Sequence, residues 1–463
     1  MNKKVLLINP SLPPSGWLAI EKLPPLGLAY LAAVLEKEGV EVKIFDNYLF
    51  GKKNDFVKGL LQEFDADIVG IYCSTATYIS CLEIARIIKE SNPDKIVVTG
   101  GPHSTLFPEQ MLNSGFFDAV VLGEGEYIFR DFVKSHSRQD WRDIKGLMFK
   151  ENGNIVSTGR AEFISNLDDL PMPARHLLPM DKYPTVVEFL DISPVYSLNT
   201  SRGCPFSCTF CSVKIIWGRS YRSFSPKRVV DEVQLLVEKY GAKGLYFRED
   251  NFTLDSRRVI EICRLIKQRG IKFQWVCESR VEHIKEDVLK EMSEAGCKAI
   301  WFGVESGSEE TLQLVDKRIT KADALAAFSL CKKYNIKTGA SFILGLPREK
   351  IGDMYKTLIF ADELDGYWTW FNYYLGIPGS SLYDMVVKEG LYDQIDANGI
   401  ARIKTKDFDY KKAMQIRRQI MLIYYFLRPK RLLRLMLESF RAGTWQDYLI
   451  GALKIVKIYK VFL

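Results

Sequence analysis

The chain has 463 residues, 47% of them apolar and 26% charged, which excludes a largely disordered protein and predicts two or three folded domains. Its nine cysteines are scattered and odd in number, so a dense disulfide framework is excluded, and a reducing, cytoplasmic setting with a local metal site is indicated. The net charge of +7 is uneven, because residues 411–463 hold twelve Lys and Arg against Glu438 and Asp447. Only the C-terminal region is therefore basic.

Residues 1–150 alternate short apolar runs with helical patterns, and the first run predicts a buried strand, not a signal peptide. The expected strands are Val5–Ile8, Val40–Phe45, Ile68–Tyr72, Ile96–Thr99 and Ala119–Leu122, with helices over Leu26–Lys37 and Ile79–Lys89. Short continuous apolar strands separated by helices indicate a parallel sheet covered on both faces. Small or polar residues follow each strand, where doubly wound sheets bind ligands. We therefore expect an α/β, Rossmann-like ligand-binding domain.

A second alternating series occupies residues 191–385. It follows residues 151–190, which carry Asn152-Gly153 and four prolines and are predicted to form a linker. The expected strands are Val195–Asn199, Gly244–Arg248, Phe273–Cys277, Ala299–Val304, Thr338–Leu344 and Trp370–Leu375, with helical patterns between them. Six strand–helix units in series indicate a partial (β/α)6 barrel, whose chemistry should lie at the carboxyl ends of the strands.

Residues 386–463 are expected to form a basic helical region without strands. The segment Arg417–Met436 interleaves basic and apolar residues, and Lys454, Lys457 and Lys460 follow at three-residue spacing. Such helices can lie on an anionic membrane surface or can pack their apolar stripe on the protein, and both alternatives stay open. No stretch of about 18 uncharged apolar residues exists, so no segment is expected to span a membrane.

Three cysteines lie in one short loop directly after the first barrel strand. Cys204, Cys208 and Cys211 are spaced i, i+4, i+7, so the loop can wrap three thiolates around one metal centre. Thiolates suit iron–sulfur clusters or zinc. A structural zinc site needs four protein ligands, whereas the next cysteine or histidine in the sequence is Cys263. Three ligands are what a cubane cluster with one open iron requires, although spacing alone leaves zinc open.

This loop resembles the CxxxCxxC signature of radical S-adenosylmethionine (SAM) enzymes, with the aromatic Phe210 between the last two cysteines. In that family the open iron of a [4Fe–4S] cluster is chelated by the amino and carboxylate groups of SAM. One electron then cleaves SAM to methionine and a 5′-deoxyadenosyl radical. The resemblance covers roughly residues 190–385 and implies the same cluster and the same cosubstrate here.

Segments at the later strand ends resemble the SAM contacts of that family. The resemblance implies that Glu249 or Asp250 takes the SAM amino group and that Arg280 meets its carboxylate. Glu305 would accept from the ribose hydroxyls, and the segment around Gly345 would form an apolar platform for adenine. The residues assigned to SAM binding are Phe210, Glu249, Asp250, Arg280, Glu305, Ser306 and Gly345.

The segments Pro24–Leu31, Gly100–His103 and Gly123–Glu126 resemble the domain that precedes the barrel in cobalamin-dependent radical SAM proteins. Matching family members hold the corrin between this sheet and the barrel. The residues assigned to cobalamin are Ser74, Thr75, Gly100, Gly101, His103, Gly123 and Glu124. Glycines let the backbone approach a ligand closely, while Ser74 and Thr75 could bond the nucleotide tail. A domain that has kept the fold and lost the ligand is the alternative.

Many cobalamin proteins carry a DxHxxG motif whose histidine binds cobalt, and this chain departs from it. The position after the first strand reads Asn9–Pro14 and holds no histidine, while Asp46–Gly51 imitates the motif with Tyr48 in place of histidine. The departure resembles the branch of the anaerobic magnesium-protoporphyrin cyclase and the hopanoid and phosphinate methylases, which generally bind cobalamin with its nucleotide base off. We therefore expect His103 to support the ligand loop and not to bind cobalt.

The resemblance implies an enzyme that acts on an unactivated C–H bond, by methyl transfer or, as the alternative, by oxidative cyclisation or rearrangement. Only a methylase forms S-adenosylhomocysteine beside 5′-deoxyadenosine. A methylthiotransferase acting on transfer RNA is disfavoured, because such enzymes carry three cysteines in the N-terminal domain, whereas the N-terminal domain of this chain has only Cys73 and Cys81. A non-enzymatic sensor would leave the set of SAM contacts without a purpose.

Several partners follow from this interpretation. We expect a small-molecule or lipid-like substrate, an electron donor such as flavodoxin or ferredoxin, and no nucleic acid. The aromatic residues Trp368, Trp370, Tyr373 and Tyr374 at the last strand fit a large apolar or flat ligand, and core packing explains them equally well. The expected location is the cytoplasm, with the basic C-terminal region as a candidate contact to the inner face of the membrane.

Overall fold

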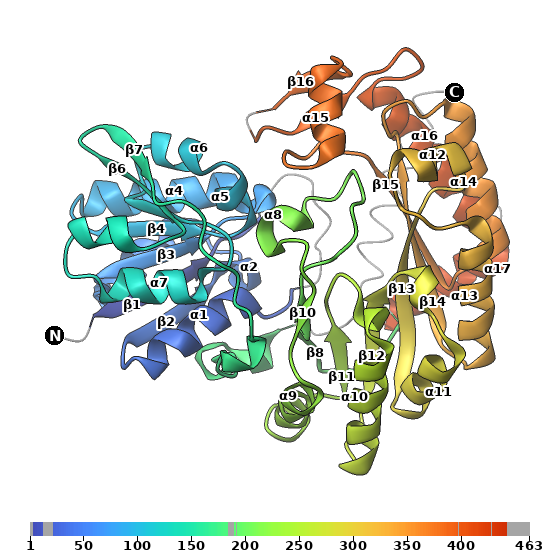
Figure 1. Cartoon of the computed structure of the whole chain (residues 1–463), viewed down its shortest axis with the longest axis horizontal. Coiled ribbons are helices and arrows are strands. Elements are labelled where there is room, and N and C mark those ends of the chain that lie inside the picture. Colours follow the sequence, from blue (N-terminus) through green and yellow to red (C-terminus); the bar gives the residue numbers. More distant parts are fainter. Residues whose placement is uncertain are drawn as a thin grey trace.

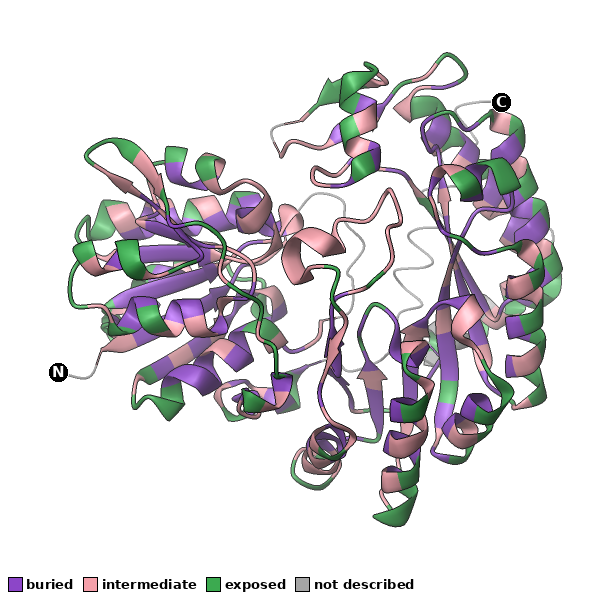
Figure 2. Ribbon diagram, in the orientation of Figure 1, coloured by how far each residue is buried: buried purple, intermediate pink, exposed green. Residues whose placement is uncertain are grey.

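The computed structural model describes residues 3–12, 22–183, 189–190, 192–396, 398–426 and 428–441. It is an α/β protein with two large sheets, one in each half of the chain (Figure 1). The strands of both sheets are largely buried, whereas the exposed residues lie mainly on the helices and turns around them (Figure 2). The predicted fold class is confirmed.

The N-terminal sheet has seven strands in the order β2-β1-β3-β4-β5-β6-β7, and β1 to β5 are parallel. Val5 and Leu7 of β1 face one apolar cluster, while Leu6 and Ile8 face another, so both faces of the sheet are covered. The strands are β1 (Lys4–Asn9), β2 (Glu41–Asp46), β3 (Ile68–Tyr72), β4 (Ile96–Gly100), β5 (Ala119–Val121), β6 (Leu147–Glu151) and β7 (Asn154–Ser157). The helices are α1 (Leu26–Lys37), α2 (Asn47–Phe50), α3 (Phe56–Glu63), α4 (Tyr78–Ser91), α5 (Pro102–Leu106), α6 (Pro108–Asn113) and α7 (Gly125–Lys134).

The antiparallel hairpin β6–β7 extends this sheet and was not predicted. Asn152 and Gly153, which the sequence analysis placed in a linker, form its two-residue turn with φ values of 50° and 80°. Asn-Gly suits such a turn because both residues tolerate the left-handed conformation that a tight hairpin requires. The sheet therefore continues as far as Ser157.

The second sheet has six parallel strands in sequential order, β8-β11-β12-β13-β14-β15, and forms the predicted partial (β/α)6 barrel. Its strands are β8 (Val195–Leu198), β11 (Gly244–Phe247), β12 (Gln274–Ser279), β13 (Cys297–Glu305), β14 (Lys337–Leu344) and β15 (Trp368–Tyr373). The helices of this half are α8 (Val213–Trp217), α9 (Pro226–Glu238), α10 (Ser256–Gln268), α11 (Glu286–Glu294), α12 (Glu309–Leu314), α13 (Lys321–Lys333) and α14 (Ile351–Leu364). A two-stranded ribbon, β9 (Ser201–Arg202) with β10 (Arg222–Ser223), follows β8.

Side-chain caps start two of the barrel helices, α10 and α13, where the sequence pattern places them. Asp255 accepts from the amides of Arg257 and Arg258 at the start of α10. Thr320 and Asp323 form a reciprocal capping box at the start of α13. Each cap satisfies backbone donors that have no partner inside the helix. These caps therefore fix the starts of α10 and α13, and the loops that leave the carboxyl ends of the strands carry the candidate site.

The C-terminal region contains strands, so the expectation of helices alone beyond residue 385 is wrong. The pair β16 (Tyr392–Ile395) and β17 (Ala401–Ile403) follows α15 (Ser381–Lys388), and α16 (Tyr410–Phe426) and α17 (Pro429–Arg441) come after it. These strands are short, which leaves little alternating pattern for sequence analysis. Within the described parts of the chain, every helix is too short or too polar to cross a bilayer. Lys454, Lys457 and Lys460 lie outside the described residues.

Helix α16 packs on the last barrel strand and on α14. It buries Ala413, Ile416, Ile420 and Tyr424 in the main core. The Tyr425 hydroxyl donates to the Thr369 carbonyl oxygen at 2.6 Å. The first part of the basic C-terminal region is therefore part of the folded core.

Candidate active site

The ribbon β9–β10 encloses the three cysteines, and we call residues 203–212 the cysteine loop. Gly203 opens the loop with a φ of 83°, and a Cβ on it would lie 2.2 Å from the carbonyl oxygen of Ser220. Glycine is required there because the turn is left-handed and brings two backbone segments together. The ribbon thus fixes both ends of the segment that carries the candidate ligands.

Cys204, Cys208 and Cys211 are the partly exposed cysteines, whereas the other six are buried. Burial raises the pKa of the Cys211 thiol to about 11, so it keeps its proton at neutral pH unless a metal replaces it. Among the residues that the structure describes, no three His, Cys, Asp or Glu side chains gather closely enough for a single metal ion. In a cubane cluster each thiolate binds a different iron, so the three sulfur atoms need not converge on a single ion.

Hydrogen bonds of side chains and backbone anchor the cysteine loop to the end of α12, to the segment after it and to α15. Ser207 donates to Asp316 at 2.6 Å, and the Thr209 hydroxyl donates to the Leu314 carbonyl oxygen at 3.0 Å. The amide of Leu382 donates to the carbonyl oxygen of Thr209 at 2.9 Å. Residues from two other parts of the chain therefore hold the loop at the carboxyl ends of the strands.

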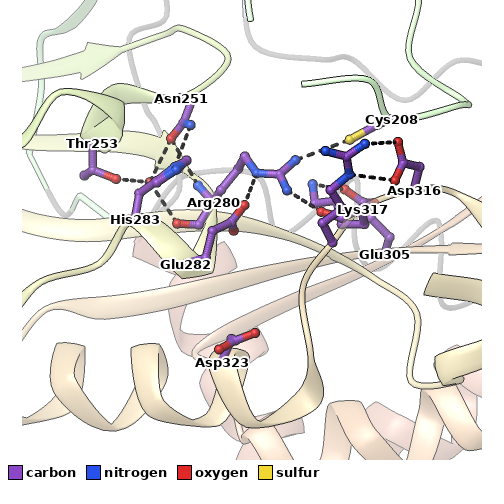
Figure 3. Close-up of polar contacts among 12 residues, drawn as sticks. Cys208, Asn251, Thr253, Arg280, Glu282, His283, Glu305, Asp316, Lys317 and Asp323 are labelled. Atoms are coloured by element: carbon purple, nitrogen blue, oxygen red, sulfur yellow. Dashed lines mark hydrogen bonds and ion pairs between the residues drawn. The ribbon is translucent and has the colours of Figure 1, made fainter. Parts of the chain in front are cut away.

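Arg280, predicted to meet the SAM carboxylate, reaches the cysteine loop from the end of β12. Its Nη1 donates to the Sγ of Cys208 at 3.3 Å, and its guanidinium lies 3.9 Å from the ring centre of Phe206. Its other nitrogens donate to Glu282 and to the carbonyl oxygen of Lys317, as Figure 3 shows. Each contact uses one hydrogen of its nitrogen, so Nη1 and Nη2 each keep a second donor for an incoming carboxylate.

The two candidates for the SAM amino group differ in their partners. Glu249 is buried, and its two oxygens accept from the hydroxyls of Thr200 and Ser201. Asp250 is exposed at the strand ends and makes no hydrogen bond or ion pair with any described residue. The surrounding protein shields part of the Asp250 carboxyl group from water, and this desolvation, with repulsion from Glu278, raises its pKa to about 6, so at neutral pH it is mainly ionised. Of the two, Asp250 has the free carboxylate.

Glu305 and Ser306 lie together after β13 but differ in availability. Glu305 has a φ of 68° and accepts from Nζ of Lys317 at 2.9 Å, with both side chains buried. Ser306 is fully buried, where its hydroxyl contacts Thr357 at 3.2 Å and accepts from the Ser308 amide. The structure therefore brings Glu305 to the site with a lysine that the sequence analysis missed, and uses Ser306 for packing.

The predicted adenine platform at Gly345 is held by Glu349, a second residue that the sequence analysis missed. Gly345 has a φ of 75°, and Glu349 accepts from the amides of Gly345 at 2.6 Å and Leu346 at 3.0 Å. A carboxylate placed four residues after a strand-end glycine is a sequence signal that could have indicated these hydrogen bonds within the loop. Phe210 of the cysteine loop packs against the main core.

The predicted cobalamin residues lie at the carboxyl ends of β3, β4 and β5. The amide of Cys73 donates to the carbonyl oxygen of Gly100, and a Cβ on Gly101 would lie 2.9 Å from the Cys73 carbonyl oxygen. Ser74 caps the turn at Thr77, with its Oγ accepting from the Thr77 amide. Glycine is therefore required at position 101, because its φ of 106° and the close approach of Cys73 leave no room for a side chain.

His103 is buried between the rings of Tyr78 and Phe107, at centre distances of 4.4 and 4.8 Å. Its Nδ1 contacts the Thr75 hydroxyl at 3.2 Å, and its Nε2 has no partner in the described chain. Burial lowers the pKa of His103 to about 4, so the imidazole is neutral. A buried nitrogen without a partner costs free energy, and a polar ligand at this edge would satisfy it. The edge therefore fits cobalamin.

Gly123 and Glu124 lie after β5, where the amide of Gly123 donates to the Thr105 hydroxyl at 3.0 Å. Both Glu124 oxygens are already used by Arg202, Arg222 and the amide of Ile164. The carboxylate predicted for cobalamin therefore has protein partners on the barrel side of the molecule.

Comparison with known proteins agrees with this geometry. Residues 198–361 match the radical SAM superfamily, and residues 21–133 match the B12 binding domain. An uncharacterized methyltransferase of Pyrococcus horikoshii is 36% identical over 93% of this chain and 94% of its own length. The cytidylyl-2-hydroxyethylphosphonate methyltransferase of Streptomyces wedmorensis is 29% identical over 84% and 83%. The anaerobic magnesium-protoporphyrin IX monomethyl ester cyclase of Cereibacter sphaeroides is 30% identical over 79% and 60%.

Two solved structures share the fold at low sequence identity. The cobalamin-dependent SAM radical enzyme OxsB superposes with a TM-score of 0.78 at 20% identity, over 100% of this chain and 75% of that one. The radical SAM methyltransferase TsrM of Kitasatospora setae gives 0.70 at 20% identity, over 84% and 76%. The chain belongs to the cobalamin-dependent radical SAM enzymes. The predicted family, enzyme class and cofactors, namely a [4Fe–4S] cluster, SAM and cobalamin, are confirmed, and a small-molecule substrate fits this enzyme.

Proposed function

We propose that the enzyme transfers a methyl group to an unactivated carbon of its small-molecule substrate. The observation that carries this proposal is the similarity, over 93% of the chain, to a protein described as a methyltransferase, with both cofactor domains included. When bound, the cluster supplies the electron that cleaves SAM, and cobalamin supplies the methyl carrier.

The residues of the chain have positioning roles in this proposal. Cys204, Cys208 and Cys211 would hold the cluster, and Asp250 would accept from the SAM amino group because its carboxylate has no other partner in the described chain. Arg280 would meet the SAM carboxylate with its remaining donors. All of these groups lie at the carboxyl ends of the barrel strands, where they would contact a single SAM molecule.

The two cofactor regions are adjacent in the fold. Helix α8, directly after the cysteine loop, contacts α5, which follows the Gly100-Gly101 pair of the N-terminal sheet. Figure 1 shows α8 between the N-terminal sheet and the barrel. A methyl carrier on one domain and the SAM site on the other would therefore share one space.

Product analysis tests the proposed reaction. Enzyme supplied with SAM, cobalamin and reductant should form about one S-adenosylhomocysteine per bound cobalamin before any substrate is added. With substrate, S-adenosylhomocysteine and 5′-deoxyadenosine should appear in equal amounts. The similarity to the magnesium-protoporphyrin cyclase favours a second candidate, oxidative cyclisation, and 5′-deoxyadenosine without S-adenosylhomocysteine would support that reaction.

We further propose flavodoxin or ferredoxin as the electron donor, because the cluster takes up single electrons and the cysteine loop is partly exposed. Contact with an anionic membrane is proposed for the C-terminal region. Leu433, Met436, Leu437 and Phe440 of α17 are each about half exposed or more. However, Arg431 pairs with Asp362 at 2.6 Å and with Asp365 at 2.8 Å, so part of the positive charge is neutralised within the protein.

A further inference from the structure

The ribbon β9–β10 places two arginines opposite each other. Arg202 and Arg222 are cross-strand partners, and like charges in that position repel each other. The carboxylate of Glu124 lies between them, with Oε1 accepting from Nη1 of Arg202 at 3.0 Å and Oε2 accepting from Nη1 of Arg222 at 2.8 Å. The ribbon that encloses the cysteine loop therefore depends on a residue from the N-terminal domain.

A second carboxylate completes the arrangement, which we call the interdomain clamp (Glu124, Glu126, Arg202 and Arg222). Oε1 of Glu126 accepts from Nη2 of Arg202 at 2.6 Å. All four side chains are less than a tenth exposed, with two positive and two negative charges in balance. Because buried charges are stable only when paired, the loss of one member leaves an uncompensated charge at the domain boundary.

The clamp also has neutral supports. Arg222 donates to the carbonyl oxygens of Ile164 at 2.7 Å and Trp217 at 3.1 Å, and its guanidinium lies 4.9 Å from the ring centre of Phe163. The guanidinium of Arg202 lies 5.0 Å from the ring centre of Trp217 and 5.6 Å from that of Tyr30. A planar guanidinium can bond at its edge and stack on its face at once, which a lysine cannot do. The position of each arginine is therefore fixed from several directions.

Both ends of the cysteine loop are attached to the N-terminal domain. Arg202 precedes Cys204 by two residues and is held by Glu124 and Glu126. After Cys211, helix α8 contacts α5, the helix that carries His103. The attachment points are the loops after β4 and β5 of the N-terminal sheet, the same loops that are predicted to contact cobalamin.

We propose that the interdomain clamp positions the cysteine loop against the cobalamin-binding loops and so fixes the distance between the cluster and cobalt. Glu124 and Glu126 are positioning residues in this proposal, because their carboxylates accept hydrogen bonds from Arg202 and Arg222. The proposal rests on the cofactor set of the family and not on methyl transfer, so failure of the proposed reaction would leave it intact.

Distance measurement in the loaded enzyme tests the proposal. In enzyme that holds cob(II)alamin and a reduced cluster, pulsed electron paramagnetic resonance reports the separation of the two paramagnetic centres. The wild-type enzyme should give one narrow distance. Glu124→Gln leaves two arginines facing each other, so the distribution should broaden or shift.

Two further variants separate positioning from general destabilisation. Glu124→Gln with Arg222→Gln restores the balance of charge and should recover a narrower distribution than Glu124→Gln alone. Glu36→Gln is the control, because it removes an exposed contact with His176 (2.9 Å) between α1 and the segment after the N-terminal sheet. Its distance distribution should match that of wild type. A wild-type distribution in Glu124→Gln that retains cluster and cobalamin would overturn the proposal.

If Glu124→Gln does not fold, hydrogen exchange in the wild-type enzyme tests whether the cysteine loop and the cobalamin-binding loops are linked. In the cluster-loaded wild-type enzyme, added hydroxocobalamin should slow amide exchange about tenfold at residues 201–204 and in α8, because the loops that bind it hold both ends of the cysteine loop. Unchanged exchange at these amides, with cobalamin bound, would show that the two sites are not linked in this way.

Discussion

The guanidinium of Arg280 donates a hydrogen bond to the Sγ of Cys208 across 3.3 Å. This places the residue that was predicted to meet SAM directly against a proposed cluster ligand. Asn251 supports the arrangement by accepting from the Arg280 amide at 3.4 Å, while its own side-chain nitrogen contacts Nδ1 of His283 at 2.9 Å. A donor to a ligating sulfur stabilises the reduced cluster, which carries one more negative charge. Arg280 should therefore influence electron transfer as well as SAM binding.

Arg280→Gln should lower the reduction potential of the cluster. A hydrogen bond to a charged group contributes about 1.5 kcal/mol, which for one electron is about 60 mV. Redox titration followed by electron paramagnetic resonance, in the absence of SAM, measures this shift. Arg264→Gln is the matched control, because Arg264 is exposed on α10 and pairs with Glu261, away from the cysteine loop. Equal potentials in wild type and Arg280→Gln would show that the contact has no electronic effect.

Replacing any one of Cys204, Cys208 and Cys211 by Ala should abolish the cluster, because each change removes one thiolate. Anaerobically reconstituted wild-type enzyme should hold about four irons per chain, and its reduced spectrum should change when SAM is added. Cys263→Ala and Cys331→Ala are the controls, since both thiols are fully buried in the core and should leave iron binding intact. Stoichiometric zinc without iron uptake on reconstitution would contradict the assignment.

Most of the fold could be predicted from the periodic patterns of apolar residues in the sequence. The alternation of Leu245 and Phe247, which face the helices, with Tyr246, which faces the barrel interior, is visible in the sequence because each strand has a period of two. By contrast, the hairpin at Asn152-Gly153 was missed although its turn signal is strong. The prolines of the following segment indicate irregular structure, and they obscure the short hairpin that precedes them.

The site was less predictable, because many of its side chains bind residues that are far away in the sequence. Glu124 was assigned to cobalamin from a local glycine-rich pattern, yet its partners Arg202 and Arg222 lie about 80 to 100 residues away in the sequence. Lys317 follows a short helix and carries no pattern of its own, so only the fold shows that it reaches Glu305. A motif identifies which loops meet at a site, whereas tertiary contacts decide which side chains remain free.

His103→Ala should leave the spectrum of bound cobalamin in its base-off form. Buried between Tyr78 and Phe107, with Nδ1 toward Thr75, His103 is held in place by protein contacts. Hydroxocobalamin should co-elute at about one per chain with wild type, and with His176→Ala as the exposed control. If nitrogen hyperfine structure is present in the Co(II) resonance and disappears in His103→Ala, His103 binds cobalt after all.

Glu349 should make stability fall as pH rises. The side chain is 1% exposed, and burial raises its pKa to about 8 despite the bonds from Gly345 and Leu346. Between about pH 4.5 and 8 the folded state keeps a proton that the unfolded state has released, so this group reduces the free energy of unfolding as pH increases. The slope is about 1.4 kcal/mol per pH unit over that window.

Glu349→Gln keeps an acceptor for the two amides and removes the titration. Its free energy of unfolding should therefore decline less than that of wild type between pH 5 and pH 8. Urea unfolding at several pH values measures the difference, provided that the midpoint changes without a change in slope. Glu286→Gln, at an exposed pair with Lys333, should follow the wild-type curve. If the free energy of unfolding has the same pH dependence in Glu349→Gln and in wild type, Glu349 does not hold the proton that the folded state retains.

The last prediction concerns the C-terminal region and the route of the substrate. Truncation after residue 410 would remove α16, which buries Ile416, Ile420 and Tyr424, so it should unfold part of the barrel. Truncation after Arg441 retains α16 and α17 and removes residues 442–463, including Lys454, Lys457 and Lys460. Each basic residue near an anionic bilayer contributes about 1 kcal/mol, so three of them should change vesicle binding about hundredfold.

Full-length enzyme should therefore pellet with anionic vesicles, remain in solution with neutral ones, and be released by salt, because salt screens exposed charges. The chain ending at Arg441 should lose most of this binding and keep its cluster and SAM cleavage. Full-length enzyme in which Lys454, Lys457 and Lys460 are changed to Gln is the matched control, since it separates charge from chain length. If wild type ignores anionic vesicles, the C-terminal region does not deliver substrate from a membrane, and a water-soluble substrate becomes the better candidate.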